Sequence, residues 1–227
     1  MHFISAIKKV LLLCSFAILS FVCNGQQPRQ DYLIPFLDTS IGREVYGFKT
    51  LKRKVVIPAK YYTVATTKFY TFALVADERG WVGINRQDSV ILKPFIFDNF
   101  PDAKKERLFR FVENGKMGFA NDRGQKIIPA RFDYAEPFCN GFAAFNVGGV
   151  EEQNGEHSYL KGGLWGFINK KGNVVIEPKI SGFSPSNKQY IKAETKDGLL
   201  LYINSKRQEE KVIPKKNSTK IFNLQKH

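Results

Sequence analysis

The chain has 227 residues, a formal net charge of +14 at pH 7 and an aromatic content of 14%. This length suits one domain of ordinary size once an N-terminal export segment is set aside. Two of the three cysteines, Cys14 and Cys23, lie in that N-terminal segment, which excludes an intrachain disulfide in the remaining chain. Of the three histidines only His157 and the terminal His227 lie beyond the segment, which disfavours a histidine-dependent catalytic triad.

Residues 1–25 have the pattern of a cleavable signal helix, which predicts an exported protein. Lys8 and Lys9 form a basic start, and residues 10–22 form an apolar core too short for a comfortable membrane span. Cleavage after Gly25 would remove two positive charges from the +14 and leave +12. We therefore expect the mature chain in the periplasm, at the outer-membrane surface or outside the cell.

Two alternatives concern the same segment. A lipid anchor on Cys23 needs a small residue just before the cysteine, and Val22 stands there instead. An uncleaved signal anchor is disfavoured because the apolar run stops early. No later segment is apolar enough to span a bilayer, so the chain is not expected to be an integral membrane protein.

Residues 46–205 contain about four degenerate copies of one motif, in which a Gly-aromatic step is followed by Ile-Pro or its equivalent. Residues 26–45 are interpreted as an N-terminal cap or linker, and a worn fifth copy is visible at 201–204 and 212–214. A fixed period of this size is typical of repeat architectures. The repeated glycine beside an aromatic residue indicates a packing requirement, because glycine lets a neighbouring backbone or ring approach where a Cβ would clash.

The spacing of the motif glycines predicts one insertion. The glycines are Gly47, Gly83, Gly118 and Gly166, so successive copies are 36, 35 and 48 residues apart. The long last spacing is explained by residues 148–162, which have the composition of a loop and no apolar rhythm.

Each copy reads as two hairpin-like strands joined by a turn. In the third copy the turn is predicted at 121–124, and Gly124 supplies the positive φ that such a turn needs; Gly172 does the same in the fourth copy. Pro129 is expected to end the second strand, because it cannot donate a ladder hydrogen bond. Residues 141–145 are expected to form a further short strand.

Helical periodicity is absent from residues 46–205, so the fold class predicted is all-β, with stacked β-hairpin repeats. One such unit cannot bury its own apolar face, and neighbouring units must therefore stack. Stacking in a line gives a solenoid, and stacking around an axis gives a propeller-like ring. The sequence leaves both arrangements open.

The fourth copy closely resembles the WG repeat of bacterial proteins, also called the KWG repeat. The resemblance rests on Leu164 to Pro178, which reads LWGFINKKGNVVIEP, and Met117 takes the tryptophan place in the third copy. Tyr46 replaces that tryptophan in the first copy, and Trp81 sits one place early in the second. The resemblance implies an interaction or scaffold module and carries over no catalytic, cofactor-binding or metal-binding residue.

Two features outside the repeat motif contain residues capable of chemistry. Cys139 is the one cysteine left after cleavage and is interpreted as a small buried hydrophobe. His157 lies beside Glu151, Glu152 and Glu156, which could bind a cation, but the spacing matches no metal motif. A solvated loop is the preferred interpretation.

Carboxylates and aromatics give weaker signals. Asp98 and Asp133 fall at equivalent places in two copies, which favours a turn or capping role over catalysis. Most aromatic rings are expected in the core, and a glycan site would use exposed exceptions. The candidates for such exceptions are Tyr61, Tyr62, Phe69 and Tyr70.

The sequence therefore predicts an exported, non-enzymatic repeat scaffold that mediates protein–protein interaction in the cell envelope or outside it. A protein that binds a glycan or the cell surface is the alternative, because a basic chain attracts anionic envelope glycans. A hydrolase with an unrecognised carboxylate pair is the third possibility. Basic residues concentrate only in the tail 206–227, so nucleic acid is not an expected partner.

Overall fold

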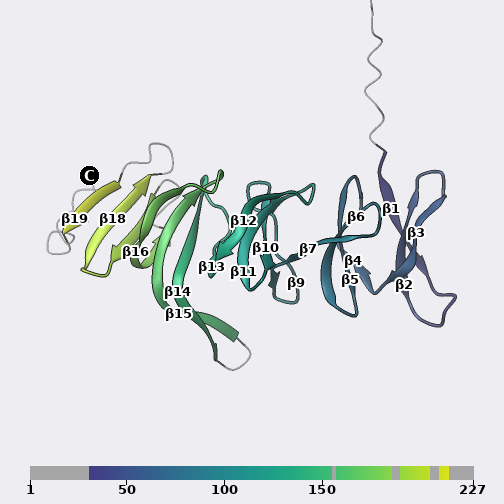
Figure 1. Cartoon of the computed structure of the whole chain (residues 1–227), viewed down its shortest axis with the longest axis horizontal. Coiled ribbons are helices and arrows are strands. Elements are labelled where there is room, and N and C mark those ends of the chain that lie inside the picture. The colour runs from purple at the N-terminus through teal and green to yellow at the C-terminus, as the bar shows by residue number, and fades with distance from the viewer. Residues whose placement is uncertain (1–30, 155–156, 186–189, 205–209, 215–227) are drawn as a thin grey trace, which may run out of the picture. The chain divides into compact units, whose positions relative to one another are not determined.

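The computed structural model describes residues 31–154, 157–185, 190–204 and 210–214, and within these ranges the regular structure consists of strands with no helix (Figure 1). The all-β prediction is thereby confirmed. The signal helix predicted at 1–25 lies outside the described residues. Among those residues, no helix has the length and apolar character needed to cross a membrane.

The repeating element is a unit of three consecutive antiparallel strands, which we name a, b and c in chain order. In the part of the chain that the structure describes, five such units follow one another, where the sequence predicted about four and a worn fifth. Their strands are β1 (Leu33–Asp38), β2 (Val45–Thr50) and β3 (Val55–Tyr61) in unit 1; β5 (Phe72–Asp77), β6 (Gly80–Asn85) and β7 (Val90–Pro94) in unit 2; β10 (Leu108–Glu113), β11 (Lys116–Asn121) and β12 (Lys126–Phe132) in unit 3; β14 (Phe142–Asn154), β15 (His157–Asn169) and β16 (Val174–Pro185) in unit 4; β17 (Tyr190–Thr195), β18 (Leu199–Asn204) and β19 (Glu210–Pro214) in unit 5.

Each c strand, or a short strand that follows it, pairs with the a strand of the next unit. The end of β7 pairs with β10, and β16 pairs with β15 through its first half and with β17 through its second. The short strands β4 (Thr63–Val64) and β13 (Tyr134–Ala135) continue β3 and β12 in the same way, pairing with β5 and β14. The resulting sheets have open ends and do not close into a ring.

The turn between strands b and c is the same in units 1 to 4. Its first residue is Thr50, Asn85, Asn121 or Asn169. Its fourth residue has positive φ and donates its N–H to the carbonyl oxygen of the first residue at 2.9–3.0 Å. The asparagine Oδ1 also accepts two backbone N–H groups, at 2.9 and 3.1 Å in the case of Asn121. The predicted role of Gly124 and Gly172 is confirmed.

Two other groups occupy the space that a Cβ on the motif glycine of strand b would take. A Cβ on Gly118 would stand 2.6 Å from the Ile128 carbonyl oxygen and 2.7 Å from the ring of Phe111, its cross-strand neighbour. Gly47 and Gly166 are crowded in the same way. The packing reason that the sequence suggested for these glycines is therefore confirmed, and it includes the backbone of strand c.

The prediction that Pro129 ends its strand is wrong. Pro129 lies inside β12, and the pairing of β12 with β11 jumps from Ile128↔Phe119 to Phe132↔Met117, so extra residues bulge out between these pairs. A proline is tolerated there because the ladder hydrogen bonds are already interrupted at a bulge. Pro58 occupies the same bulge in β3, whereas Pro94 does end β7.

Unit 2 departs from the others by one residue. Counted back from its turn, Trp81 takes the place of Trp165, Val82 takes the glycine place and Gly83 takes the place of the buried Phe119. The spacings of 36 and 35 residues are counted to and from Gly83, which is not equivalent to the motif glycines of the other units. The ring of Phe72 lies against Gly83 and fills the volume left by the missing phenylalanine.

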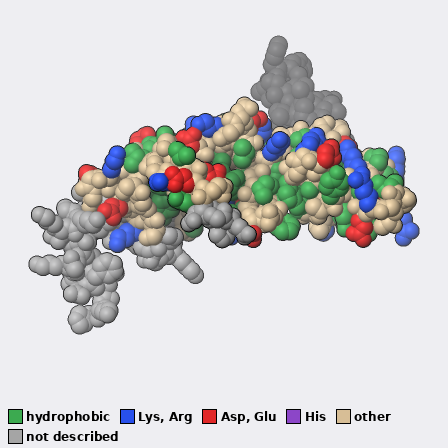
Figure 2. Space-filling model, turned by 90° about the horizontal axis from the view of Figure 1, so that it is seen from below, with side chains coloured by type: hydrophobic (Ala, Val, Ile, Leu, Met, Phe, Trp, Pro, Cys, Tyr) green, Lys and Arg blue, Asp and Glu red, His purple; other side chains and the backbone are tan. Residues whose placement is uncertain are grey.

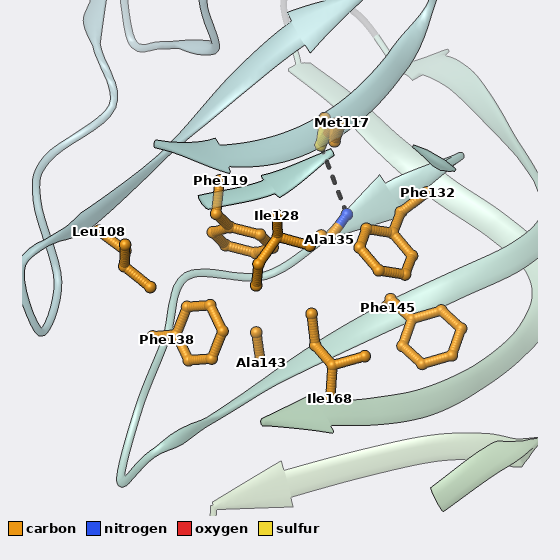
Figure 3. Packing of buried hydrophobic residues seen from close by; sticks show 10 residues of the cluster. All are labelled: Leu108, Met117, Phe119, Ile128, Phe132, Ala135, Phe138, Ala143, Phe145 and Ile168. Atoms are coloured by element: carbon orange, nitrogen blue, oxygen red, sulfur yellow. Dashed lines mark hydrogen bonds between the residues drawn. The ribbon is translucent and has the colours of Figure 1, made fainter. Parts of the chain in front are cut away.

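Four hydrophobic clusters hold the units together, and each draws its buried residues from two consecutive units. The cluster between units 3 and 4 is drawn in Figure 3, where Phe119 packs edge-on against Phe138 with ring centroids 4.7 Å apart. Its members are Leu108, Met117, Phe119, Ile128, Phe132, Ala135, Phe138, Ala143, Phe145 and Ile168. The core is thus built at the junctions between units, as expected for stacked repeats.

Two predicted segment boundaries need correction. Residues 149–154 and 157–162 are not a loop, because β14 and β15 pair from Gly149↔Gly162 to Asn154↔His157 and continue the pairing that runs from Phe142↔Asn169 to Val147↔Leu164. Loop-like composition misled the prediction because a two-stranded ribbon exposed on both faces needs no apolar rhythm. Residues 33–38 lie in the segment 26–45 that the sequence predicts as a cap or linker, but they form β1 and pair with β2 along their whole length.

Candidate interaction surface

The aromatic residues that define the repeat are buried in the hydrophobic core. Phe48, Phe119 and Phe167, which follow the motif glycines, are at most 1% exposed. Tyr61 and Phe69, two of the four aromatics considered for a glycan site, are also buried, whereas Tyr62 and Tyr70 are exposed. Function must therefore use residues that differ between copies.

The first copy-specific feature is a small hairpin that sequence reasoning missed. Strands β8 (Ile96–Phe97) and β9 (Phe100–Pro101) are joined by Asp98 and Asn99, both with positive φ, and are inserted after strand c of unit 2. Phe97 and Phe100 are 67% and 65% exposed. Figure 2 shows hydrophobic side chains gathered on one face over the half of the molecule that carries the first units.

Trp81 supports this hairpin from strand β6. Its Nε1 donates to the Asn99 carbonyl at 3.0 Å, and its ring centroid lies 6.1 Å from that of Phe100. Trp81, Phe97 and Phe100 thus form an aromatic surface, which we call the aromatic hairpin. A signal for it existed in the sequence, because two phenylalanines flank an Asp-Asn pair that favours a tight turn.

The second copy-specific feature is the outer half of the β14–β15 hairpin, residues 149–154 and 157–162, which we call the arm. In unit 3 the equivalent hairpin closes with Asn114 and Gly115, at φ 52° and 72°. Gly148 and Gly163 occupy the same two places in unit 4, at φ 78° and 69°. The arm is therefore inserted between the two central residues of a hairpin turn.

The base of the arm is fixed by two side chains. Asn146 is fully buried, accepts the Gly149 N–H at 2.9 Å and donates to the Gly162 carbonyl at 3.3 Å. Asp133 accepts the Gly148 N–H at 3.3 Å and pairs with Lys116. The Lys116 ammonium beside it lowers the pKa of Asp133.

The arm carries most of the acidic insertion seen in the sequence. Glu152 accepts hydrogen bonds from Lys161 at 3.0 Å and from the Tyr159 hydroxyl at 2.8 Å, and the latter bond raises the pKa of Tyr159. Val150 is 65% exposed. No group of three metal-ligating side chains occurs among the described residues, which do not include the His157 side chain.

The two aspartates considered together are not brought into one site by any described contact. Asp98 forms part of the tip of the aromatic hairpin, and Asp133 caps a backbone N–H at the base of the arm. These placements are those of turn and capping residues.

One buried ion pair has the composition of a site but is fully engaged. The Arg110 guanidinium donates to both oxygens of Asp102, at 2.8 and 2.9 Å, and to the Ala135 carbonyl at 2.8 Å, and it stacks over Phe95. Burial raises the pKa of the nearby Glu136. The cluster ties units 2, 3 and 4 together, and both carboxylate oxygens of Asp102 accept hydrogen bonds from Arg110.

The prediction that Cys139 is buried is wrong. Cys139 is exposed and opens the tight turn Asn140-Gly141, where both residues have positive φ and Cys139 bridges Phe142. The neighbouring Phe138 is the residue that enters the core. The basic tail predicted at 206–227 lies outside the described residues except for 210–214.

These features define a repeat protein made of stacked antiparallel β units, with copy-specific additions at the aromatic hairpin and the arm. Two tandem segments, residues 117–150 and 165–198, match the model of the WG-containing repeat. Residues 117–198 thus contain two tandem WG-containing repeats, as the sequence resemblance implied. No curated protein matches the chain.

The matched segments also explain how the units cohere. Each begins at the tryptophan place of strand b, at Met117 or Trp165, and ends within or just after strand a of the next unit. The sequence repeat is therefore offset from the three-stranded unit and spans two units. Residues 151–154 and 157–162, most of the arm, fall between the two matched segments, which identifies the arm as an addition to the family pattern.

Proposed function

We propose that this protein is an exported, non-enzymatic scaffold that binds a partner protein in the cell envelope or outside it. One observation carries the proposal. Among the described residues, the three most exposed large hydrophobic side chains are Phe97, Phe100 and Val150, and all three lie on the two copy-specific additions. Exposed aromatic residues grouped on a surface are typical of interaction sites.

The signal pattern of residues 1–25 supports export, and the repeat family supports a scaffold role. The proposal includes the absence of catalysis. It is supported by Asp102, whose two carboxylate oxygens both accept hydrogen bonds from Arg110. A screen of the mature chain against glycoside and ester substrates should detect no turnover that exceeds that of an Asp102→Asn, Glu136→Gln variant.

The test is a pull-down from envelope extracts with the mature chain as bait. The variant Phe97→Ala, Phe100→Ala should lose a partner that the wild-type chain retains. Leu51→Ala is the matched control, because Leu51 is 58% exposed on an ordinary b–c turn. Capture of no protein above background by the wild type would contradict the proposal, and capture of the same proteins by all three baits would exclude the aromatic hairpin as their binding site.

A glycan ligand is the second candidate, and the aromatic hairpin favours it. Trp81 and Phe100 are tilted by 45° and, with Phe97, offer ring faces of the kind on which sugars stack. An array of anionic envelope glycans tests this candidate. Binding that persists in the Phe97→Ala, Phe100→Ala variant would exclude the aromatic hairpin as the glycan site.

A further inference from the structure

We propose that the outer edge of β14, along residues 149–153, binds an extended basic segment of a partner protein as an added β-strand. This inference rests on the proposed scaffold function and names the chemistry of the partner. It concerns the arm and is independent of the aromatic hairpin.

The outer edge of β14 is open along the arm because β13, which pairs with this edge at the base of the hairpin, is a short strand. β13 pairs with β14 only at Tyr134↔Asn146 and Ala135↔Phe145. Beyond Asn146, no described strand pairs with this side of β14, while its other side pairs with β15 throughout. An unpaired edge of this kind is a template for another strand, and β-augmentation is a recurring mode of peptide recognition.

The start of the open edge is defined by side chains. The N–H groups of Gly148 and Gly149 are satisfied by Asp133 and by the buried Asn146, so the free edge begins after them. An incoming strand would lie end to end with β13 and continue its place in the sheet. Because Asn146 also holds Gly162 across the hairpin, the ribbon is oriented before binding, which lowers the entropic cost of association.

The charge of the arm indicates a basic partner. Residues 148–162 contain three glutamates and one lysine, a net charge of −2 in a chain whose total is +14. Lys161 is already paired with Glu152, and Glu151 is exposed and forms no ion pair with the described residues. A lysine or arginine opposite Glu151 would complete a cross-strand pair.

On the face of the ribbon opposite to Glu151, the arm favours an apolar residue in the partner strand. Val150 and Glu151 are consecutive and therefore point to opposite faces of the ribbon. Val150 is exposed, so an apolar residue of the partner strand opposite it would bury surface on both sides. The edge of β15 is the poorer choice because Lys161 lies on it. The segment favoured thus combines an apolar residue with a neighbouring lysine or arginine.

The test uses an eight-residue peptide that alternates valine and lysine, with blocked ends, and the full mature chain. We expect calorimetry to show saturable binding that weakens about tenfold in Glu151→Lys and survives in Lys161→Gln. The same peptide with N-methyl groups on alternate residues cannot form ladder hydrogen bonds and should not bind. Equal binding of the N-methylated peptide, or of a valine–glutamate peptide, would overturn the proposal.

A second variant removes the arm without disturbing the body. Deleting residues 149–162 joins Gly148 to Gly163 as a two-residue turn, and Asn146→Val copies the Val112 of unit 3. This variant should fold, as judged by circular dichroism, and lose peptide binding; retained binding would refute the inference. A partner retained by the aromatic hairpin in the pull-down, together with failure of the peptide, would leave the scaffold function standing and reject the arm.

Discussion

The hairpins β10–β11 and β14–β15 begin alike and end differently. Both pair from the b–c turn outward in the same register, and both place a phenylalanine, Phe111 or Phe145, opposite the motif glycine. They diverge where unit 3 closes its turn and unit 4 inserts the arm. The body of the hairpin is thus fixed by packing between units, whereas its far end is free to acquire new residues.

The residue just before the divergence shows how the difference is accommodated. Val112 of unit 3 packs against the hydrophobic cluster of units 3 and 4, and the equivalent Asn146 is buried and bonds to two backbone groups of the arm. A buried amide is tolerated because the arm supplies its partners. Without the arm, the same position needs an apolar side chain.

The largest effect is expected from the part that both hairpins share. Phe111→Ala removes a fully buried ring that covers Gly118 and should lower the free energy of unfolding by about 3–5 kcal/mol. Urea denaturation followed by circular dichroism measures the loss. Val75→Ala, at the equivalent place in unit 2, should cost less because valine fills a smaller volume; equal losses would show that the equivalence of the units is wrong.

A smaller loss is expected when the glycine of the pair is changed. Gly118→Ala places a Cβ 2.6 Å from the Ile128 carbonyl oxygen, so the backbone of β12 must shift. We expect a loss of about 1–3 kcal/mol in thermal or urea unfolding. Val82→Ala tests the same place in unit 2, where a larger side chain is native, and should not show this steric penalty.

Exchange of the divergent residue should act locally. Asn146→Val in the full chain leaves the Gly149 N–H and the Gly162 carbonyl without their side-chain partners. Global stability should fall by about 1 kcal/mol, and amide hydrogen exchange should accelerate in 149–153 and 159–162 but not in β10–β11. Unchanged exchange in the arm would show that Asn146 does not fix it.

The sequence revealed what is repeated and little of what is added. The turn glycines, the packing role of the motif glycines and the need for stacking follow from residues that recur, and recurrence separates a requirement from an accident. Pro129 misled because a lone strand gives no sign of a bulge, which depends on the partner strand. Unit 2 misled because Phe72 compensates from another strand for the shifted Gly83.

The candidate surface was harder to foresee for a related reason. Exposure of Phe97 and burial of Phe69 depend on which residue enters a junction between units, and both lie in aromatic-rich segments with no period of their own. The arm was located by its spacing but was assigned to a loop, since its register is set by pairing with the opposite strand. Cys139 was misplaced because its neighbour Phe138 fills the core instead.

The smallest effect concerns the turns that lead into the two hairpins and depends on pH. Glu106, before β10, accepts the Gly141 N–H before β14 at 3.1 Å and pairs with Lys170 at 2.7 Å. Burial alone would raise the pKa of Glu106, but the bonds to Lys170 and Gly141 outweigh it and lower the pKa below its usual value. The carboxylate therefore stabilises the fold above that value, and this contribution is lost as the pH falls through the folded-state pKa.

Glu106→Gln should accordingly cost about 0.5–1 kcal/mol at pH 7 and almost nothing at the acid end of the transition. Glu136→Gln is the matched control, because burial raises the pKa of Glu136. For a raised carboxyl pKa the sign reverses: ionisation above the unfolded pKa opposes folding, so removal of this carboxylate should stabilise at pH 7 and have no effect in acid. Unfolding free energies measured from pH 3 to 7 should therefore diverge in opposite directions for the two variants, and parallel curves would contradict the assignment of Glu106 as a link between the two hairpins.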